Sequence, residues 1–524
     1  MNADLARLPD DTAELKNIIF SLQSIQEKNQ SRIEFLEERI RLLQKELFGR
    51  KTEKQPKPDQ QQLLLFDEEN ADDPDDAPET VAVPAHNRKK RGRKPLPEEL
   101  PRIEVVLDID ESEKVCGCGC ELSHIGNDTS EKLEIIPAKI QVIRYVRKKY
   151  ACKNCEGVEG DGPTVKIASL PPQIIPKSIA TPGLLAHIVV AKFEDALPFY
   201  RQEKILQRMG VDIPRSTLCN WSVKVADEIK PIMKLLQDEI RSGPLINIDE
   251  TPVQVLKEPG RSNTSKSYMW VYRGGDPGKP VLLYQYHPTR SGQVALSFLE
   301  GYRGYIQTDG YSGYDALEKK DGILLLGCWA HVRRKFFEVI KAKSGKKKEG
   351  VADKALKLIA DLYRIEKQAM EKNLDPDAVY RLRQEEAKPI LDKFHKWLQI
   401  KADITPPRGL LGIAVNYALK NWDRLIRYID DGRLRPDNNL AENAIRPFVV
   451  GRKNWLFSGS PNGASASASL YSLIETAKAN GLRPYEYLRF LFEKLPYTET
   501  EQDYKNLLPW NIDSALLNCW SQNV

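Results

Sequence analysis

The chain has 524 residues, of which 41% are hydrophobic and 29% charged, and its formal net charge is +5. A chain of this length is expected to form about three or four domains, and its hydrophobic share is ordinary for a globular protein. It holds no apolar run of the roughly 18 residues that span a membrane, and its acidic start differs from a basic and then apolar signal peptide. We therefore expect a cytoplasmic protein rather than a secreted or membrane-inserted one.

Leucine and isoleucine side chains recur every seven residues in the first part of the chain. One series begins at Leu15 and a second at Ile19, and the polar residues Gln26 and Asn29 interrupt them. Such a heptad pattern is typical of a coiled coil, in which a buried polar residue can fix the register of the helices. We predict that residues 1–50 form a leucine-zipper-like helix that makes the chain a homo-oligomer. A helix packed on its own protein is the alternative.

The next segment, residues 51–100, changes from acidic to basic and is poor in large apolar residues. This composition is typical of a disordered linker. Its basic end, at residues 88–94, includes Arg91, Arg93 and Lys94, and a short arginine-rich hook of this kind fits a narrow, A·T-rich minor groove. We predict a DNA contact here, and a plain solvated linker is the alternative.

Five of the eight cysteines lie close together in the segment 101–165. The second group is a Cys-x-x-Cys pair, a spacing that presents two thiolates to one tetrahedral Zn²⁺. The first group holds three cysteines at single-residue spacing, so we expect two of the three to complete a structural zinc site, and which two stays open. Reduced, buried cysteines are the alternative. The candidate zinc ligands are Cys116, Cys118, Cys120, Cys152 and Cys155.

A helical pattern follows in residues 166–240. Two helices are expected over 183–193 and 199–208, and a glycine turn then leads to a third helix near Arg215, for which Ser216 is the expected cap. This order is the layout of a helix-turn-helix, and ordinary helical packing is the alternative. The residues expected to contact DNA are Arg215, Ser216, Thr217 and Asn220.

Two aspartates that follow buried strands mark the segment 241–480 as the place of the chemistry. Asp249 follows a strand over 245–248, and Asp309 follows another over 305–308. Three consecutive strands, a helix and then strand-helix units are the order of the ribonuclease-H-like fold, in which these two strand ends share one edge of the sheet. The predicted strands are 245–248, 267–273, 281–286, 305–308 and 323–326. We therefore predict an α/β catalytic domain with a ribonuclease-H-like fold.

A third carboxylate is needed if the two aspartates hold a pair of divalent ions, because each ion requires several oxygen ligands. Glu442 is the best candidate, since a helix capped by Asp437 or Asn438 would present Asn438 and Glu442 on one face. Glu250 and Glu475 are competing candidates. Carboxylate oxygens suit Mg²⁺ or Mn²⁺.

The stretch between the second and third carboxylates is longer than the fold requires. Its pattern is mostly helical over 351–428, so we predict a helical insertion within the catalytic domain at about 340–430. The final segment, 481–524, is expected to be a C-terminal tail region.

Basic side chains accompany the third carboxylate. Arg446, Arg452 and Lys453 follow Glu442, and we expect them to hold the phosphate backbone of DNA, where charge fixes register without reading sequence. A solvated turn is the alternative for the last two. His331 opens the helix after the fifth strand, where it either approaches the same site or serves as a hydrogen-bonding residue at a helix start.

Several motifs, kept in order along nearly the whole chain, resemble the transposases of the insertion-sequence-66 family. They are LFGRKTEK, GRKPLP, IDETPVQVL, TDGYSGY, GCWAHVRRKF and AENAIRPFVVGRKNWLFSGS, besides the zipper and the cysteine module. The resemblance implies a DDE-type transposase with Asp249, Asp309 and Glu442 as its catalytic, magnesium-binding triad. It also implies that small accessory proteins of the same element act as helpers. One departure is the first cysteine group, which is Cys-x-Cys where the family has a Cys-x-x-Cys pair.

We predict a DNA transposase that binds the terminal inverted repeats of an insertion sequence and target DNA, and that catalyses metal-dependent strand cleavage and strand transfer. Two other classes stay open, a DNA-binding regulator without strand-transfer activity and a metal-dependent nuclease. We expect the protein in the bacterial cytoplasm, associated with the nucleoid when it is bound to DNA.

Overall fold

The computed structural model describes residues 140–151, 165–342 and 350–513, and six single positions. These positions are Phe20, Leu22, Gln26, Leu36, Ile40 and Leu517. Five of them fall in the predicted zipper, where each is helical and exposed. The candidate zinc ligands and the basic hook at 88–94 lie outside the described residues, so both stay predictions.

The chain divides into two compact units, one formed by Asp67–Ala168 and the other by Met1–Phe66 with Ser169–Val524. In the smaller unit the structure describes one antiparallel ribbon, in which β1 (Lys149–Ala151) pairs with β2 (Val165–Ile167). Across the described ranges of the chain, no helix is both long and apolar enough to cross a membrane.

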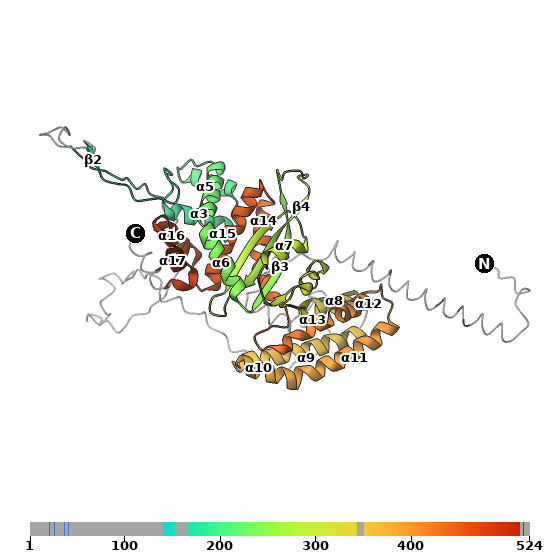
Figure 1. Ribbon diagram of the computed structural model, residues 1–524. Helices are drawn as coiled ribbons and strands as arrows, with labels where there is room; N and C mark the ends of the chain where they lie inside the picture. The colour runs from blue at the N-terminus through green and yellow to red at the C-terminus, as the bar shows by residue number, and fades with distance from the viewer. Residues whose placement is uncertain are drawn as a thin grey trace, which may run out of the picture. The chain divides into compact units, whose positions relative to one another are not determined.

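A mixed sheet organises the larger unit, and Figure 1 labels two of its strands, β3 and β4. The strand order is β5-β4-β3-β6-β7. The strands are β3 (Leu245–Val255), β4 (Lys266–Gly274), β5 (Val281–His287), β6 (Gly304–Gln307) and β7 (Ile323–Leu326). β3, β4 and β5 pair antiparallel, whereas β6 and β7 run parallel to β3. The short strand β8 (Phe457–Ser458) joins the end of β3.

The position of Asp249 in its strand differs from the prediction. β3 does not end at Asp249, because it continues to Val255 while paired with β4. Its parallel pairing with β6 stops at Asn247 opposite Gln307. Asp249 therefore lies inside a long strand, just beyond the point where β3 and β6 stop pairing.

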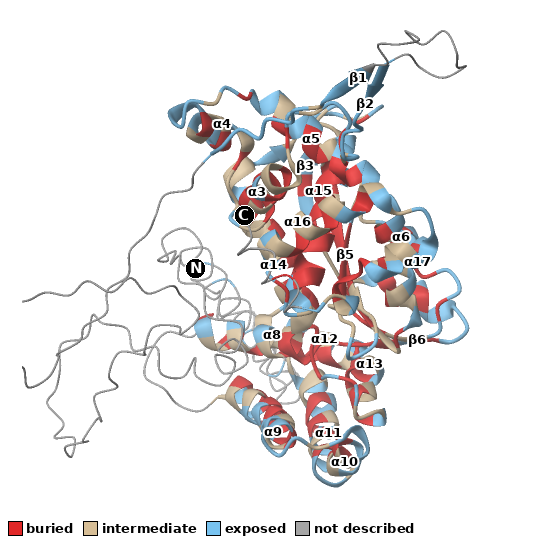
Figure 2. Cartoon of the chain, turned by 90° about the vertical axis from the view of Figure 1, so that its left-hand side faces the viewer, coloured by how far each residue is buried: buried red, intermediate tan, exposed pale blue. Residues whose placement is uncertain are grey.

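The edge strand β5 is covered by a helix. α15 (Pro461–Ala479) packs along β5, and Figure 2 shows both elements largely buried. The hydroxyl oxygen of Ser472 accepts the N–H of Tyr284 at 2.8 Å, and that of Thr476 accepts the N–H of Leu282 at 3.1 Å. Because unpaired groups at a sheet edge invite pairing with another chain, α15 both completes the core and protects this edge.

Other helices around this core come from segments on both sides of the sheet in the sequence. Before β3 lie α3 (Pro182–Phe193), α4 (Phe199–Arg208), α5 (Arg215–Glu228) and α6 (Lys230–Ser242). Within and after the sheet lie α7 (Gly292–Phe298), α14 (Asn439–Trp455), α16 (Pro484–Lys494) and α17 (Glu501–Asn506). α16, which follows the sheet in the sequence, packs against α3, which precedes it. Residues from before and after the sheet therefore share one hydrophobic core.

α4 and α5 lie on either side of a turn, as a helix-turn-helix requires, and Gly210 in that turn has a left-handed φ of 83°. The predicted cap is wrong. α5 begins at Arg215, whose N–H is accepted by the carboxylate of Glu203 in α4 at 3.0 Å rather than by a Ser216 side chain. The exposed side of α5 carries Arg215, Ser216 and Asn220, whereas Thr217 is half-buried.

Helices fill the segment where the insertion was predicted. They are α9 (Val351–Glu371), α10 (Pro376–Leu382), α11 (Lys388–Ile404), α12 (Leu410–Lys420) and α13 (Trp422–Ile426), and α8 (Trp329–Ala342) precedes them. They enclose a second core that contains stacked and edge-on aromatic rings, among them Trp329, Phe394 and Trp422. Figure 1 shows α9, α10 and α11 grouped apart from the strands. The insertion thus shares this second core with α8 and with Leu326 of β7.

One buried arginine ties this second core to the segment that leads back to the sheet. Arg383, in the π-helical turn between α10 and α11, pairs with Glu366 through Nε at 2.9 Å and Nη2 at 2.7 Å. It also donates to the backbone carbonyls of Tyr428, Asp431 and Leu434. Since these carbonyls precede α14, Arg383 holds the approach to that helix in place.

We expect Arg383→Met to lower the free energy of unfolding by about 3–5 kcal/mol, because the change leaves Glu366 and three carbonyl groups without their charged donor. Urea unfolding followed by circular dichroism measures this. Arg381→Met is the matched control, since Arg381 is exposed in the preceding turn, and its effect should stay within about 0.5 kcal/mol. Equal losses for the two variants would contradict the role assigned to Arg383.

Candidate active site

The two predicted aspartates lie at equivalent positions relative to two neighbouring parallel strands, Asp249 within β3 and Asp309 just after β6. Asn247 of β3 is opposite Gln307 of β6, and each aspartate comes two residues later, as Asp249 and Asp309. Adjacent strands are about 4.8 Å apart, so this register brings the two aspartates to the same edge of the sheet. The Asp249 carboxylate accepts the N–H of Glu250, and the Asp309 carboxylate accepts the N–H of Tyr311, each at 2.9 Å.

Three buried amide side chains join these strands to the start of α14. The Nδ2 of Asn247 donates to Oε1 of Gln307 and to Oδ1 of Asn438, both at 2.9 Å. Asn438 in turn donates to the carbonyl of Ile248 at 2.9 Å, and Gln307 donates to two further backbone carbonyls. Buried polar groups are tolerated when they are hydrogen-bonded in this way, and the network therefore holds β3, β6 and α14 in one arrangement.

The amide network also places α14, the helix of Glu442, next to the part of β3 that holds Asp249. Glu442 follows Asn438 by one helical turn, and its N–H donates to the Asn438 carbonyl at 3.2 Å, so the two side chains share a face of α14. Asn438 thus links α14 to β3 rather than capping the helix with its side chain, while Asp437 accepts the N–H of Asn439 at 3.1 Å.

The pKa of Asp249 is raised by its surroundings. Burial, together with the negative charges of Glu250, Glu442 and Asp309, raises the pKa of the Asp249 carboxyl to about 8. Like charges within a few ångströms of a buried carboxyl disfavour its ionised form. A divalent cation at this edge would relieve that repulsion, and carboxylate oxygens are the donors that Mg²⁺ prefers.

The two competing carboxylates have other partners. The Glu250 side chain is 1% exposed, and it accepts hydrogen bonds from Arg290 and from the hydroxyl of Tyr314. Glu475 lies in α15 and pairs with Lys478 at 3.1 Å. Glu250 is therefore next to the site but already bound by its own cation, and Glu475 belongs to an ion pair on a different helix.

Arg290 links Glu250 to the second aspartate. Its Nη2 is 3.9 Å from Oδ2 of Asp309, and its guanidinium carbon lies 3.8 Å from the centre of the Tyr311 ring. A cation stacked on an aromatic ring and bound to a buried carboxylate has little freedom. Sequence reasoning missed Arg290, although Tyr311 and Tyr314 lie in the TDGYSGY motif that includes Asp309.

A tyrosine of the insertion also contacts Asp309. The hydroxyl of Tyr417, in α12, donates to the Asp309 carbonyl at 2.6 Å. Gly310 follows with a φ of +80°, and a Cβ atom at this position would lie 2.9 Å from the Tyr417 hydroxyl. Only glycine fits that turn comfortably, which gives the Asp-Gly step of the motif a steric reason.

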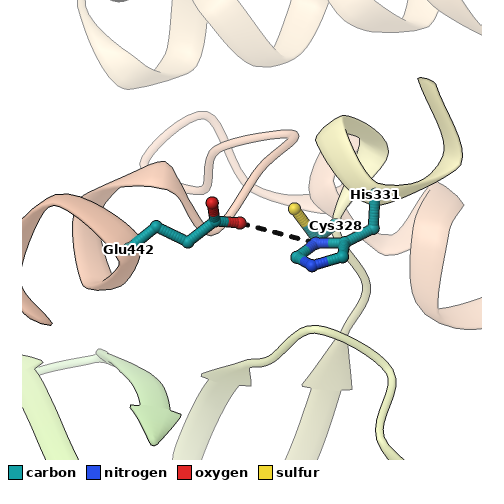
Figure 3. A group of neighbouring side chains, drawn as sticks. All are labelled: Cys328, His331 and Glu442. Atoms are coloured by element: carbon teal, nitrogen blue, oxygen red, sulfur yellow. Dashed lines mark ion pairs between the residues drawn. The ribbon is translucent and has the colours of Figure 1, made fainter. Parts of the chain in front are cut away.

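Two side chains near the start of α8, His331 and Arg334, contact the Glu442 carboxylate. Oε1 of Glu442 lies 3.5 Å from Nδ1 of His331, and Oε2 accepts a hydrogen bond from Nη2 of Arg334 at 3.2 Å. Figure 3 shows His331 and Cys328 facing the Glu442 carboxylate. The ligand atoms of Cys328, His331 and Glu442 all lie within 4.8 Å of one another.

The predicted phosphate-binding residues lie on α14 itself. Arg446 and Lys453 are exposed, whereas Arg452 is half-buried and donates from Nη1 to the Thr251 hydroxyl at 3.1 Å. The alternative of a solvated turn for Arg452 and Lys453 is wrong, because α14 continues to Trp455. Arg452 is thereby held against β3, at a residue two positions beyond Asp249 in that strand.

Family models match most of the chain. A model described as "Transposase IS66 family" matches residues 177–466, and the "IS66 C-terminal element" matches residues 472–510. The "zinc-finger binding domain of transposase IS66" matches residues 113–156, which include the candidate zinc ligands. A model described as "Transposase C of IS166 homeodomain" matches residues 35–105.

Similar proteins occur in Sinorhizobium fredii. "Uncharacterized protein y4jD" is 33% identical over 452 residues, which are 83% of this chain and 86% of the relative. "Uncharacterized protein y4qI" is 32% identical over 437 residues, 81% of this chain and 78% of that protein. "Uncharacterized protein y4hP" is 29% identical over 499 residues, 91% of this chain and 88% of that protein.

We expect Asn247→Asp to lower the free energy of unfolding by about 2–4 kcal/mol, because a buried charge replaces a donor that faces two amide oxygens. Urea unfolding gives the value. Gln285→Glu introduces the same charge at an exposed position of β5, and it should be nearly neutral. If both variants unfold at the same urea concentration, the amide network does not hold the three elements together.

The Asp249 pKa predicts how the stability of the metal-free protein depends on pH. The folded state keeps a proton that the unfolded state releases near its ordinary pKa of 3.8. Stability from this group is therefore fully present below about pH 4 and is lost as the pH rises towards about 8, with a slope of up to about 1.4 kcal/mol per pH unit. Asp249→Asn should remove this slope in urea unfolding with a chelator present.

Asp276→Asn, at an exposed site in the turn after β4, is the matched control and should keep the slope. An Asp249→Asn protein whose stability still falls with pH as in the wild type would show that another group causes the dependence.

Proposed function

The chain belongs to the IS66 family of transposases, and on that premise we propose that it binds the ends of an insertion sequence and catalyses metal-dependent DNA cleavage and strand transfer. The observation that supports the proposal is the amide network that joins β3, the end of β6 and the start of α14, the elements next to Asp249, Asp309 and Glu442. The negative charges of Glu442 and Asp309 also act on the Asp249 carboxyl. We also propose that the sheet is ribonuclease-H-like, since its order β5-β4-β3-β6-β7 is the one expected of that fold.

Asp249, Asp309 and Glu442 are the residues that would hold two hard divalent ions, Mg²⁺ or Mn²⁺. Their donors are carboxylate oxygens, and the repulsion that raises the Asp249 pKa is a charge imbalance that divalent cations relieve. When bound, such ions would activate the attacking hydroxyl group and stabilise the leaving oxygen of the phosphodiester.

Arg290 and Tyr417 act as positioning residues in this proposal. Arg290 stands between Glu250 and Asp309, and Tyr417 holds the Asp309 carbonyl. Together they fix the turn after β6 from two sides, so that the Asp309 carboxylate does not have to be ordered when DNA binds. Pre-organised ligands of this kind lower the cost of reaching the reactive geometry.

The exposed cations of α14, Arg446 and Lys453, would contact the DNA backbone next to the carboxylates. The zinc module, the basic hook and the exposed side of α5 would add contacts to the element ends. The zipper at residues 1–50 would pair two chains, which fits a reaction that brings two DNA ends together. Small accessory proteins and target DNA complete the proposed partners.

We expect Asp249→Asn, Asp309→Asn and Glu442→Gln each to reduce cleavage by at least about 10³-fold while DNA binding changes less than about twofold. The amide keeps the shape of the side chain but loses the charge that holds the metals, and ligands that act as a unit are not additive. The assay uses purified protein, Mg²⁺ and DNA that carries the terminal repeats. Gel electrophoresis separates binding, nicking and joining.

Asp276→Asn is the control that should cleave normally. Wild-type protein that binds the repeats but never cuts them would favour the regulator, and nicking without joining would favour the nuclease. Normal cutting by Glu442→Gln alone would mean that the third ligand lies elsewhere.

A further inference from the structure

A second cluster of metal-binding side chains lies beside Glu442, and it differs in chemistry from the three carboxylates. Cys328 directly precedes α8, and His331 is in the first turn of that helix. Glu442 comes from the first turn of α14. Their sulfur, nitrogen and oxygen atoms all lie within 4.8 Å of one another (Figure 3).

Two of these atoms lack ordinary partners. Among the buried side-chain atoms of the described residues, Nδ1 of His331 and Oε1 of Glu442 have no hydrogen-bond partner, although they lie 3.5 Å apart. A buried polar atom without a partner costs about 1–3 kcal/mol. The Cys328 side chain is buried and is not in a disulfide. Three ligand atoms therefore face one another where a cation would satisfy all of them.

The geometry fits a tetrahedral transition-metal ion. Metal–ligand distances of about 2.0–2.3 Å in a tetrahedral site place neighbouring ligand atoms about 3.3–3.8 Å apart. The 3.5 Å between His331 and Glu442 already meets this range, and the widest separation allowed by the cluster, 4.8 Å, requires a contraction of about 1 Å.

We propose that Cys328, His331 and Glu442 form a binding site for a transition-metal ion such as Zn²⁺. A thiolate and an imidazole select zinc over magnesium, which prefers oxygen ligands and keeps its waters. Three protein ligands leave the fourth position of zinc open to water or to an oxygen of a bound phosphate. The site shares Glu442 with the proposed catalytic centre but does not rest on transposase activity.

Neighbouring groups contact all three ligands. Nη1 of Arg334 lies 3.3 Å from Nε2 of His331, so this guanidinium has to turn away for Nε2 to carry the proton when Nδ1 binds a cation. The backbone N–H of Asn438 donates to the Cys328 sulfur at 3.2 Å. Nη2 of Arg334 donates a hydrogen bond to Oε2 of Glu442. The other carboxylate oxygen, Oε1, is directed at His331. Such outer contacts orient the ligands of metal sites and are part of their affinity.

The test measures zinc in the full-length chain after dialysis against Zn²⁺ and then against metal-free buffer. We expect about two zinc ions per chain, one at the cysteine module and one at this site. Cys328→Ser and His331→Gln should each lose about one, and His331 is only partly buried, so the second variant should fold even if the first does not. Cys219→Ser, at an exposed cysteine, is the matched control and should lose none.

A second background isolates the site. With Cys152 and Cys155 both changed to Ser, the remaining zinc should be about one per chain and should disappear when His331→Gln is added. The proposal is overturned if that background holds no zinc, or if His331→Gln leaves the zinc content of either background unchanged. Because the readout is metal content, it stands or falls separately from cleavage of DNA.

Discussion

Asn247 is the third residue of β3 and donates two hydrogen bonds, one to Gln307 on the neighbouring strand and one to Asn438, 191 residues later. An amide buried at this depth must find its partners or destabilise the fold, so β6 and α14 have to meet β3 in one register. Asp249, Asp309 and Glu442 are each placed by that register. The position of three acidic side chains thus depends on three neutral ones.

The insertion takes part in the same constraint. Arg383 holds the chain before α14, Tyr363 donates to Asp437 at 2.9 Å, and Tyr417 donates to the carbonyl of Asp309. The helical insertion therefore fixes both the helix that carries Glu442 and the turn that carries Asp309. We interpret it as a support for the acidic cluster rather than a neutral addition to a loop.

Charge is distributed unevenly around the cluster. Arg290 neutralises Glu250, and Arg334 bonds to one oxygen of Glu442. The pKa of Asp249 is raised because it is buried close to Glu250, Glu442 and Asp309. Concentrated negative charge is unfavourable in a protein on its own, and it is the property expected of carboxylates whose partners are metal ions. The amide network maintains this concentration despite its cost.

The sequence by itself predicted where the five strands of the main sheet lie, the limits of α3 and α4 to within one residue and the start of α5, because hydrophobic periodicity and turn residues act locally. It also singled out Glu442. It did not show that β3 continues past Asp249, that Asn438 links α14 to β3, or that Cys328 and His331 face Glu442. The tertiary structure decided these points, because the partners of a buried polar side chain come from segments far apart in the chain, and only their packing brings them together.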